Sequence, residues 1–252
     1  MTKIILSGCN GRMGQVICAM IKENPRAEIV AGFDINNTVQ NRFPVYSDWS
    51  KITEQADVII DFSNPDTLKG LLNFAKSKNL ALVAATTGYS SSQTDEIIAA
   101  SSVIPVFKSG NMSLGINLLI DLVRKATEIL GETFDIEIIE RHHNMKVDAP
   151  SGTALMIADA ISETMVTPCE YIYDRHSARR KRGKNEIGIH TVRGGTIPGD
   201  HLVVFAGANE ILEINHHAAS REVFATGAIH AAIFTSGKAP GLYNMNDLIK
   251  GV

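Results

Sequence analysis

The feature that most constrains the fold is a glycine-rich loop between a short apolar run and an amphipathic segment near the N-terminus. Residues 4–6 form the apolar run, and the loop from Gly8 to Gly14 follows it with the spacing GxxGxxG. Apolar residues then recur at helical spacing, at Met13, Val16, Ile17, Met20 and Ile21, before a second apolar run at 29–33. This order predicts a βαβ unit whose loop faces a ligand.

The alternation of short apolar runs and helical patterns continues beyond that unit. The runs 58–62, 80–85 and 103–107 have the length of buried strands, and Pro65 precedes a helical pattern over Leu68, Leu71, Leu72 and Ala75. Such alternation predicts an α/β fold: a Rossmann-type, doubly wound, mostly parallel sheet with ligands at the carboxyl ends of its strands.

The pattern changes near Ser113, where we expect a second domain of α+β type. A long helix leads into the alternating segment 134–138, and the strand candidates 187–192, 201–206 and 211–216 are separated by turns containing Gly or Pro. We expect these last strands to be antiparallel. Periodicity alone does not decide which domain the final helix candidate, 221–236, packs against.

Charge and cysteine content limit the partners. The 24 basic and 27 acidic residues nearly cancel, so no global field would attract nucleic acid or an anionic membrane, and a small-molecule partner is expected. The three cysteines have no metal-type spacing and favour free thiols in a reducing compartment. No signal peptide and no membrane-spanning run is found in the sequence, so we expect a cytoplasmic protein.

The glycine loop and Asp34 together indicate a dinucleotide site. Backbone N–H groups and the dipole at the helix N-terminus attract a pyrophosphate, and Asp34 ends the second strand, where a carboxylate can bind a ribose diol. The alternatives are a turn without a ligand and a site for a flavin or another nucleotide. Ile35 follows, with no Arg or Lys nearby to neutralise a 2′-phosphate, so NADH is favoured over NADPH unless Arg12 supplies that charge.

The densest polar segment, 140–154, lies between a predicted strand and a helical pattern. His142 and Lys146 are the candidates for proton transfer, and Ser151 can cap a helix whose first residues, Gly152 and Thr153, offer N–H groups and a hydroxyl to a carboxylate. Each feature alone is more often structural. Their combination with a dinucleotide loop favours a catalytic site, and the spacing predicts no metal.

The segment 140–154, ERHHNMKVDAPSGTA, resembles the signature of the 4-hydroxy-tetrahydrodipicolinate (dihydrodipicolinate) reductase family. Similar family segments surround it: the loop 8–14 and residues 61–63, 85–88, 111–113 and 186–195. The resemblance implies an NAD(P)H-dependent reduction of 4-hydroxy-tetrahydrodipicolinate to tetrahydrodipicolinate, on the route to diaminopimelate and lysine. It also implies a homotetramer assembled through the second domain.

The same resemblance assigns roles to residues. His142 becomes the general acid and base, Lys146 a proton donor that also contacts substrate, and the substrate binders are His143, Lys146, Ser151, Gly152 and Thr153. The cofactor-binding residues are Gly8, Cys9, Asn10, Gly11, Arg12, Met13, Asp34, Phe62, Ala85, Thr86, Thr87, Ser109, Gly110, Asn111 and Met112. The last helix joins the nucleotide domain, giving domains of 1–112 with 220–252, and 113–219.

Two positions and one stretch depart from the family pattern. Ala85 stands where many members have Gly, and Ile35 replaces the Arg that some members use for NADPH. The basic stretch 175–184 lacks the usual glycines and is expected to be a solvated surface loop, or alternatively a lid that attracts the dianionic substrate.

Rival functions are another two-domain amino-acid dehydrogenase and a non-catalytic NADH-binding sensor. The 140–154 segment argues against the first, and a sensor needs neither His142 nor Lys146. The same basic stretch raises nucleic-acid binding, which the absence of interleaved aromatics opposes.

Overall fold

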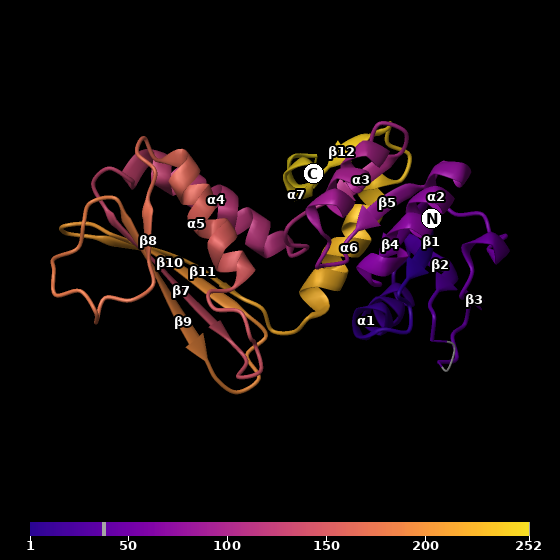
Figure 1. Cartoon of the computed structure of the whole chain (residues 1–252), viewed down its shortest axis with the longest axis horizontal. Coiled ribbons are helices and arrows are strands. Elements are labelled where there is room, and N and C mark those ends of the chain that lie inside the picture. The colour runs from indigo at the N-terminus through magenta and orange to yellow at the C-terminus, as the bar shows by residue number, and fades with distance from the viewer. Residues whose placement is uncertain (37–38, 252) are drawn as a thin grey trace. The chain divides into compact units, whose positions relative to one another are not determined.

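The computed structural model describes residues 1–36 and 39–251, which form two compact units (Figure 1). The first consists of Met1–Leu114 and Glu222–Val252, and the second of Gly115–Arg221. Asn37, Thr38 and Val252, which belong to the predicted nucleotide-binding domain, lie outside the described residues. Within the described residues, no helix is both long and apolar enough to cross a membrane.

The first unit is built on a parallel sheet, as the alternation of strands and helices predicted. Its strands have the order β12-β6-β5-β4-β1-β2-β3, and every pairing is parallel. Their bounds are β1 Thr2–Ser7, β2 Ala27–Phe33, β3 Val45–Tyr46, β4 Val58–Asp61, β5 Ala81–Ala84, β6 Pro105–Lys108 and β12 Gly241–Tyr243. The order reverses at β1, which pairs with both β2 and β4, and ligands of such sheets bind at this point.

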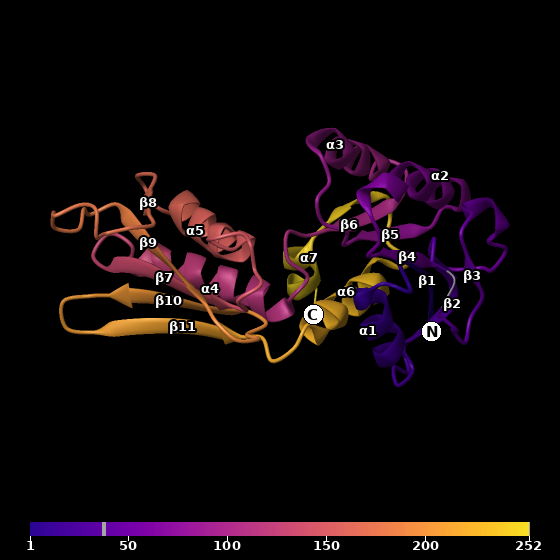
Figure 2. The same ribbon diagram turned by 60° about the horizontal axis from the view of Figure 1, so that its bottom comes forward.

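Helices cover both faces of this sheet, with α2 and α3 on one side and α1 and α6 on the other (Figure 2). The helices are α1 Arg12–Ile21, α2 Leu68–Lys78, α3 Ser91–Ala100, α6 Glu222–Thr235 and α7 Met245–Lys250, with 3-10 turns η1 Trp49–Lys51 and η2 Pro65–Thr67. Successive residues of β1 point to opposite faces, so Ile4 packs in one core and Ile5 in the other.

The last long helix, α6, belongs to the first unit. Ala225, Ala228 and Ile229 of α6 are buried in the same core as Ile17 of α1. A Cβ atom at Gly227 would lie 1.7 Å from the carbonyl oxygen of Met112, so only glycine permits this close approach. The backbone at Met112 therefore packs directly against α6, although the two are more than 100 residues apart in the sequence.

The second unit is a mixed sheet with helices on one face. Its strands have the order β11-β10-β7-β9-β8, and helices α4 and α5 pack on the core residues Ile136, Ile138, Val203 and Phe205. The bounds are α4 Leu114–Leu130, β7 Asp135–His142, α5 Gly152–Thr164, β8 Glu170–Ile172, β9 Glu186–Arg193, β10 Asp200–Ala206 and β11 Ile211–His217.

One sequence expectation about this sheet was wrong. β10 is antiparallel to both β7 and β11, but β9, which was expected to be antiparallel as well, runs parallel to β7 and β8. The reason is the crossover between β7 and β9, which contains α5 and returns the chain to the starting end of the sheet before β9 begins.

The basic stretch 175–184 is exposed for most of its length but is tied to the sheet by three arginines. Arg175 bonds to both Glu137 and Glu186, and Arg180 bonds to Glu186. Arg182, whose side chain is 17% exposed, donates to Asp135 at 2.9 Å and to the Ile136 carbonyl at 3.0 Å. The expectation of a solvated surface loop is therefore confirmed for most of this stretch, whereas the half-buried Arg182 departs from it.

Candidate active site

The glycine loop forms a cradle that side chains would fill. Gly8 has a φ of +78°, and a Cβ there would lie 2.4 Å from the Phe62 carbonyl oxygen; a Cβ at Gly14 would lie 2.1 Å from that of Gly8. Gly11 is the N-cap of α1 and supplies no side-chain cap to the first N–H groups of the helix. These groups and the helix dipole suit an anionic ligand such as a pyrophosphate.

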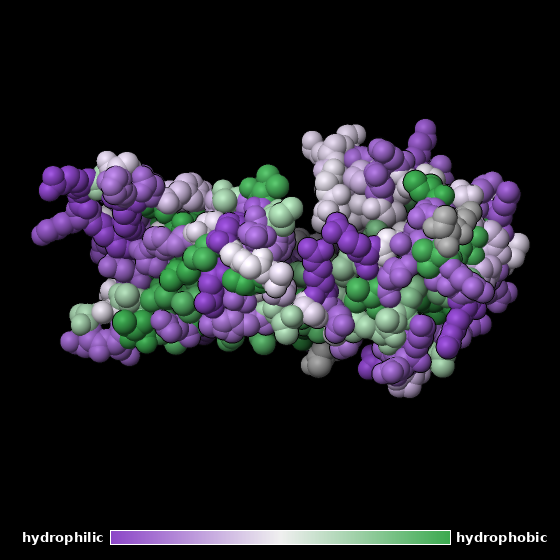
Figure 3. All heavy atoms as spheres, turned by 90° about the horizontal axis from the view of Figure 1, so that it is seen from below, coloured by the Kyte–Doolittle hydropathy of each residue, from purple (hydrophilic) through white to green (hydrophobic). Residues whose placement is uncertain are grey.

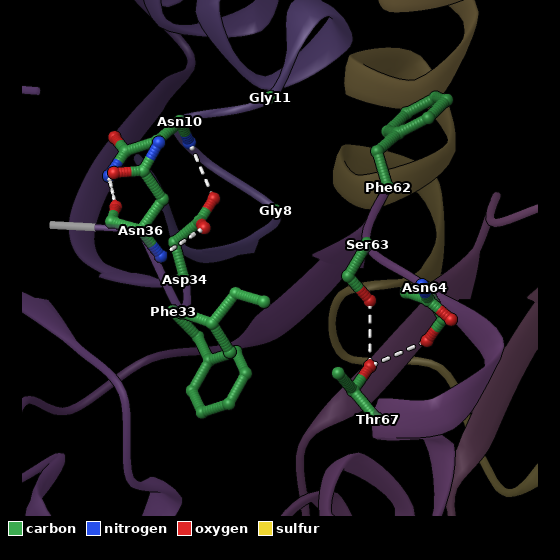
Figure 4. A pocket seen from close by; sticks show the side chains of 11 residues that line it. Gly8, Asn10, Gly11, Phe33, Asp34, Asn36, Phe62, Ser63, Asn64 and Thr67 are labelled. Carbon is green, nitrogen blue, oxygen red and sulfur yellow. Dashed lines mark hydrogen bonds between the residues drawn. The ribbon is translucent and has the colours of Figure 1, made fainter. Parts of the chain in front are cut away.

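Asp34 lies beside this loop and is held there by backbone donors (Figure 4). Its Oδ2 accepts a hydrogen bond from the N–H of Asn10, and its Oδ1 accepts one from the N–H of Asn36, both at 2.9 Å. Asp34 and the glycine loop form one wall of a pocket of about 310 Å³. The segment after β4 forms the opposite wall. The lining residues are Gly8, Asn10, Gly11, Phe33, Asp34, Ile35, Asn36, Phe62, Ser63, Asn64 and Thr67.

A second pocket of the same unit, of about 550 Å³, shares Gly11, Phe62 and Ser63 with the first. It is lined in addition by Arg12, Met13, Ala84, Ala85, Thr86, Thr87, Lys108, Ser109, Gly110, Asn111, Met112 and Phe224. Every predicted cofactor-binding residue except Cys9 lines one of the two pockets. The Cys9 side chain is instead fully buried in the core.

A buried carboxylate joins the walls of these pockets. Asp61, at the end of β4, is fully buried and accepts hydrogen bonds from Ser63 Oγ at 2.5 Å, Thr86 Oγ1 at 2.6 Å and Tyr89 Oη at 2.8 Å. Burial and the charge of Asp61 raise the pKa of Tyr89, so its hydroxyl stays protonated and donates a hydrogen bond to Asp61. Asp61 thereby fixes the segments after β4 and β5 relative to each other.

In the second unit, His142 ends β7 and faces a fully buried glutamate. His142 Nδ1 lies 2.6 Å from Glu140 Oε2, because residues two apart on a strand point to the same face. Arg193 of β9 contacts the same carboxylate at 2.7 Å through Nη1 and 2.8 Å through Nη2. Burial alone would raise the pKa of Glu140, but hydrogen bonds from Arg193 and His142 lower it to about 2.

The start of α5 joins this cluster. Ser151 caps the helix as predicted, since its Oγ accepts the Ala154 N–H at 3.1 Å, and its own N–H donates to Glu140 Oε1 at 3.0 Å. Its Oγ also lies 3.2 Å from Nε2 of His201, a buried residue of β10. Burial, reinforced by neighbouring His142, lowers the pKa of His201 to about 4, so this imidazole is neutral near pH 7.

The remaining predicted residues lie on the segment between β7 and α5 or at the start of α5. Lys146 Nζ is 2.8 Å from Asp148 Oδ1, and the Lys146 N–H donates to the carbonyl oxygen of His143 at 3.1 Å. Arg193 Nη2 donates to the Asp148 carbonyl oxygen at 2.7 Å, which ties this segment to the buried cluster. Gly152, the first residue of α5, is exposed.

Several residues at both sites were not among the sequence predictions. Glu140 could have been found, because it lies within the polar segment and shares a strand face with His142. Arg193 lies within the family-like segment 186–195, but only the pairing of β9 with β7 brings it to the cluster. His201 carries no local signal, since only the pairing of β10 with β7 brings it there. In the first unit, Lys108 ends β6 and lines the second pocket, directly before the predicted residues 109–112. In the described part of the chain, no group of three or more His, Cys, Asp or Glu residues is arranged to hold a metal ion.

Comparison with known proteins gives full-length matches. Residues 2–112 match a family model described as dihydrodipicolinate reductase, N-terminus, and residues 115–249 match one described as dihydrodipicolinate reductase, C-terminus. A 4-hydroxy-tetrahydrodipicolinate reductase of Caldanaerobacter subterraneus is 54% identical, with 99% of each chain covered. Another, of Clostridium tetani, is 49% identical, with 99% of this chain and 97% of the relative covered.

Solved structures share the architecture. A dipicolinate-bound dihydrodipicolinate reductase from Paenisporosarcina sp. TG-14 superposes with a TM-score of 0.82 at 24% identity, covering 98% of this chain and 99% of that one. A probable dehydrogenase from Thermotoga maritima gives a TM-score of 0.61 at 12% identity, covering 98% and 92%. At these identities the likeness concerns the fold.

Proposed function

Because this chain belongs to the dihydrodipicolinate reductase family, we propose that it reduces 4-hydroxy-tetrahydrodipicolinate to tetrahydrodipicolinate with NAD(P)H, on the diaminopimelate route to lysine. The observation that carries the proposal is the placement of His142 beside Glu140 and the N-terminus of α5. It combines a group able to transfer a proton with a helix start able to bind a carboxylate.

The first unit supplies the cofactor site. When bound, the dinucleotide contributes the hydride of the reaction. The cradle at Gly8, Gly11 and Gly14 admits the pyrophosphate close to the backbone, and the first N–H groups of α1 point their partial positive charge at it. Asp34 accepts hydrogen bonds from the ribose hydroxyls, and Lys108 and Arg12 add positive charge to the second pocket.

The second unit supplies the substrate site and the proton. Gly152 and Thr153 at the start of α5 bind one carboxylate of the substrate, with His143 and Lys146 as further contacts. His142 is the general acid and base, and Lys146 is a second proton donor. The reaction consumes one hydride and one proton and releases the 4-hydroxyl group as water, so atoms and charge balance.

The first pocket favours NADH. Its carboxylate, Asp34, would repel a 2′-phosphate, and Ile35, whose side chain is 82% exposed, offers no charge. Among the described residues that line this pocket, none is Lys or Arg. The KM for NADH is therefore expected to lie below that for NADPH, and the opposite order would contradict this preference.

The functional test follows the oxidation of NADH and of NADPH by absorbance while a synthase generates the substrate from pyruvate and aspartate semialdehyde. Wild type is expected to turn over, and His142→Ala and Lys146→Ala to be slowed about 100-fold or more while still binding cofactor. Cofactor binding is measured separately by titration. Tight binding without turnover of wild type would reject the reductase and favour an NADH sensor.

The proposed compartment is the cytoplasm, which suits three free thiols.

The proposed assembly is a homotetramer that joins through the second unit. Leu202 and Val204 lie on the sheet face opposite to α4 and α5 and are half-buried, and Ile211 of the edge strand β11 is 66% exposed. Figure 3 shows hydrophobic residues, in green, at the surface of this unit on the left. Light scattering should give a tetramer of the 27.3 kDa chain and a smaller species for Val204→Lys; a monomeric wild type would contradict it.

A further inference from the structure

We propose that Glu140 is the positioning residue for His142, fixing a proton on Nδ1 so that Nε2 is the atom that exchanges a proton with the substrate. The inference rests on the proposed function, since it concerns the same reaction. It adds a residue to the site and assigns the two nitrogens of the imidazole separate roles. The same carboxylate holds the N–H of Ser151, so one group orients both the acid and the start of α5.

The donors around Glu140 carry the first step. Oε2 faces His142 Nδ1 at 2.6 Å and Arg193 Nη1 at 2.7 Å. Oε1 accepts from Arg193 Nη2 at 2.8 Å, from the Ser151 N–H at 3.0 Å and from Thr191 Oγ1 at 3.1 Å. A carboxylate pair with Arg in this bidentate geometry stays ionised, and an ionised carboxylate only accepts hydrogen bonds.

The second step follows from the chemistry of imidazole. Because Glu140 can only accept, Nδ1 of His142 must donate, and a neutral His142 then carries its one proton on Nδ1 and a lone pair on Nε2. When His142 is protonated, the proton it gives up is the one on Nε2. The tautomer is thus set by Glu140, a fully buried residue two positions before His142 on the same strand.

A glycine lies beside Nε2 of His142. A Cβ atom at position 199 would lie 3.0 Å from His142 Nε2, and the residue there is glycine, with a φ of +157°. A side chain at this position would press on the nitrogen that the proposal assigns to proton transfer. Gly199 therefore leaves room beside the reacting atom.

The other charged or titratable groups around His142 have partners or are neutral. Arg193 of β9 is paired with Glu140, and Lys146 is paired with Asp148. His201 of β10 packs edge-on against His142 with ring centroids 5.3 Å apart and lies beside Ser151. Of the groups near His201, His216 lowers its pKa further and Asp200 raises it. Within the described residues, no carboxylate besides Glu140 is recorded in contact with Nδ1 of His142.

A matched control exists on the same strand. Glu137, three residues before Glu140, also accepts from a histidine, at 2.7 Å from His190 Nε2, and also binds arginines, here Arg175 and Arg182. This pair lies on the partly exposed side of the strand, and neither residue is among those assigned to the reaction. The same Glu→Gln change at the two positions separates loss of an ion pair from loss of the proposed role.

The first experiment measures the tautomer directly and does not depend on turnover. Side-chain ¹⁵N NMR of the full chain without cofactor, with the His142 signals identified by their loss in His142→Gln, should show neutral His142 protonated on Nδ1. In Glu140→Gln the Nε2-protonated form should appear, while Glu137→Gln should leave the His142 spectrum unchanged. A wild-type His142 protonated on Nε2 would overturn the proposal even if Glu140→Gln fails to fold.

The second experiment is kinetic. Glu140→Gln should lower kcat about 100-fold with a KM for substrate within about threefold of wild type, and Glu140→Asp should recover part of the loss. Glu137→Gln should stay within about twofold of wild type. Equal losses in both Gln variants would refute the positioning role, whereas an inactive wild type with the expected tautomer would reject the proposed function alone.

Discussion

His142 Nδ1 and Glu140 Oε2 lie 2.6 Å apart, on the same face of one strand and separated by a single residue. The pair is completed from elsewhere in the chain, by Arg193 on β9 and by the N–H of Ser151 at the start of α5. The alternation of side chains along β7 thus brings His142 to Glu140, and the pairing of β9 with β7 brings Arg193, whose charge keeps Glu140 ionised. Changes to this cluster and to the nucleotide pockets have distinct expected outcomes.

Gly199→Ala should impair catalysis more than folding. The added Cβ would lie 3.0 Å from His142 Nε2, at a backbone φ that side chains rarely adopt, so the imidazole must shift. Displacements of this size cost about 10- to 100-fold in kcat. Gly194→Ala is the control, because nothing lies within 4 Å of a Cβ there. Steady-state kinetics and thermal melts of both variants test this, and wild-type kcat in Gly199→Ala would contradict it.

Ile35→Arg should shift the cofactor preference toward NADPH. The residue is 82% exposed at the edge of the Asp34 pocket, so a guanidinium there meets a 2′-phosphate without displacing packed atoms. One such contact is worth about 1.4 kcal/mol, or about tenfold in affinity. Titrations with NADPH and NADH measure it, and Ile98→Arg on α3 provides the same charge elsewhere. Unchanged NADPH affinity in Ile35→Arg would count against the position of the ribose.

Asp61→Asn should destabilise the protein and weaken cofactor binding together. Three hydroxyl donors converge on this buried carboxylate, and an amide leaves at least one of them facing another donor. The expected loss is about 2–4 kcal/mol in the free energy of unfolding, against about 1 kcal/mol for Tyr89→Phe, which removes a single bond. Denaturant unfolding and NADH titration give both values. An Asp61→Asn variant with normal binding would show that the pocket walls do not depend on it.

Stability should fall in two steps as the pH is lowered. His201 has a pKa lowered from 6.5 to about 4, so its contribution is complete above 6.5 and is lost between these values, because the unfolded chain takes up the proton first. Glu140 has a pKa lowered from 4.5 to about 2, so its contribution is lost between 4.5 and 2. Each shift corresponds to roughly 3 kcal/mol.

Unfolding free energies from pH 7 to pH 2 test the two steps separately. His201→Gln should flatten the upper step and Glu140→Gln the lower one. His230→Gln, at an exposed position of α6, should leave the whole curve parallel to wild type. If His201→Gln retains the full loss between pH 6.5 and 4, the buried imidazole is not its source.

Local patterns were sufficient for the glycine loop and for strands β1, β2, β4, β5 and β6 of the nucleotide unit, but not for the short strands β3 and β12 or for the placement of α6. The strand, loop and helix around Gly8 follow from consecutive residues, and Asp34 follows from its position at the end of the next strand. The parallel sheet follows from the alternation of strands and helices, because a crossover helix forces parallel pairing. His142 and Ser151 were predicted for the same reason, since they lie within one continuous segment.

Relations between distant segments could not be predicted in this way. The pattern of 187–192 indicated a strand but not its partner, and the parallel pairing of β9 with β7 depends on the path of the chain through α5. That pairing alone brings Arg193 to Glu140. The ion pairs of the basic stretch could not be predicted either. They join its arginines to Glu137 on β7 and Glu186 on β9, and only the fold brings these strands to the stretch.

The placement of α6 has a consequence for how the protein is made. The sheet face of the first unit that carries Ile4 and Ile60 is covered partly by α6, which is synthesised only after the whole second unit, Gly115–Arg221. During synthesis, this apolar face of the first unit therefore stays uncovered by α6 while the second unit is being made. Chaperone binding or aggregation of the nascent chain is expected in this interval, which ends when α6 emerges.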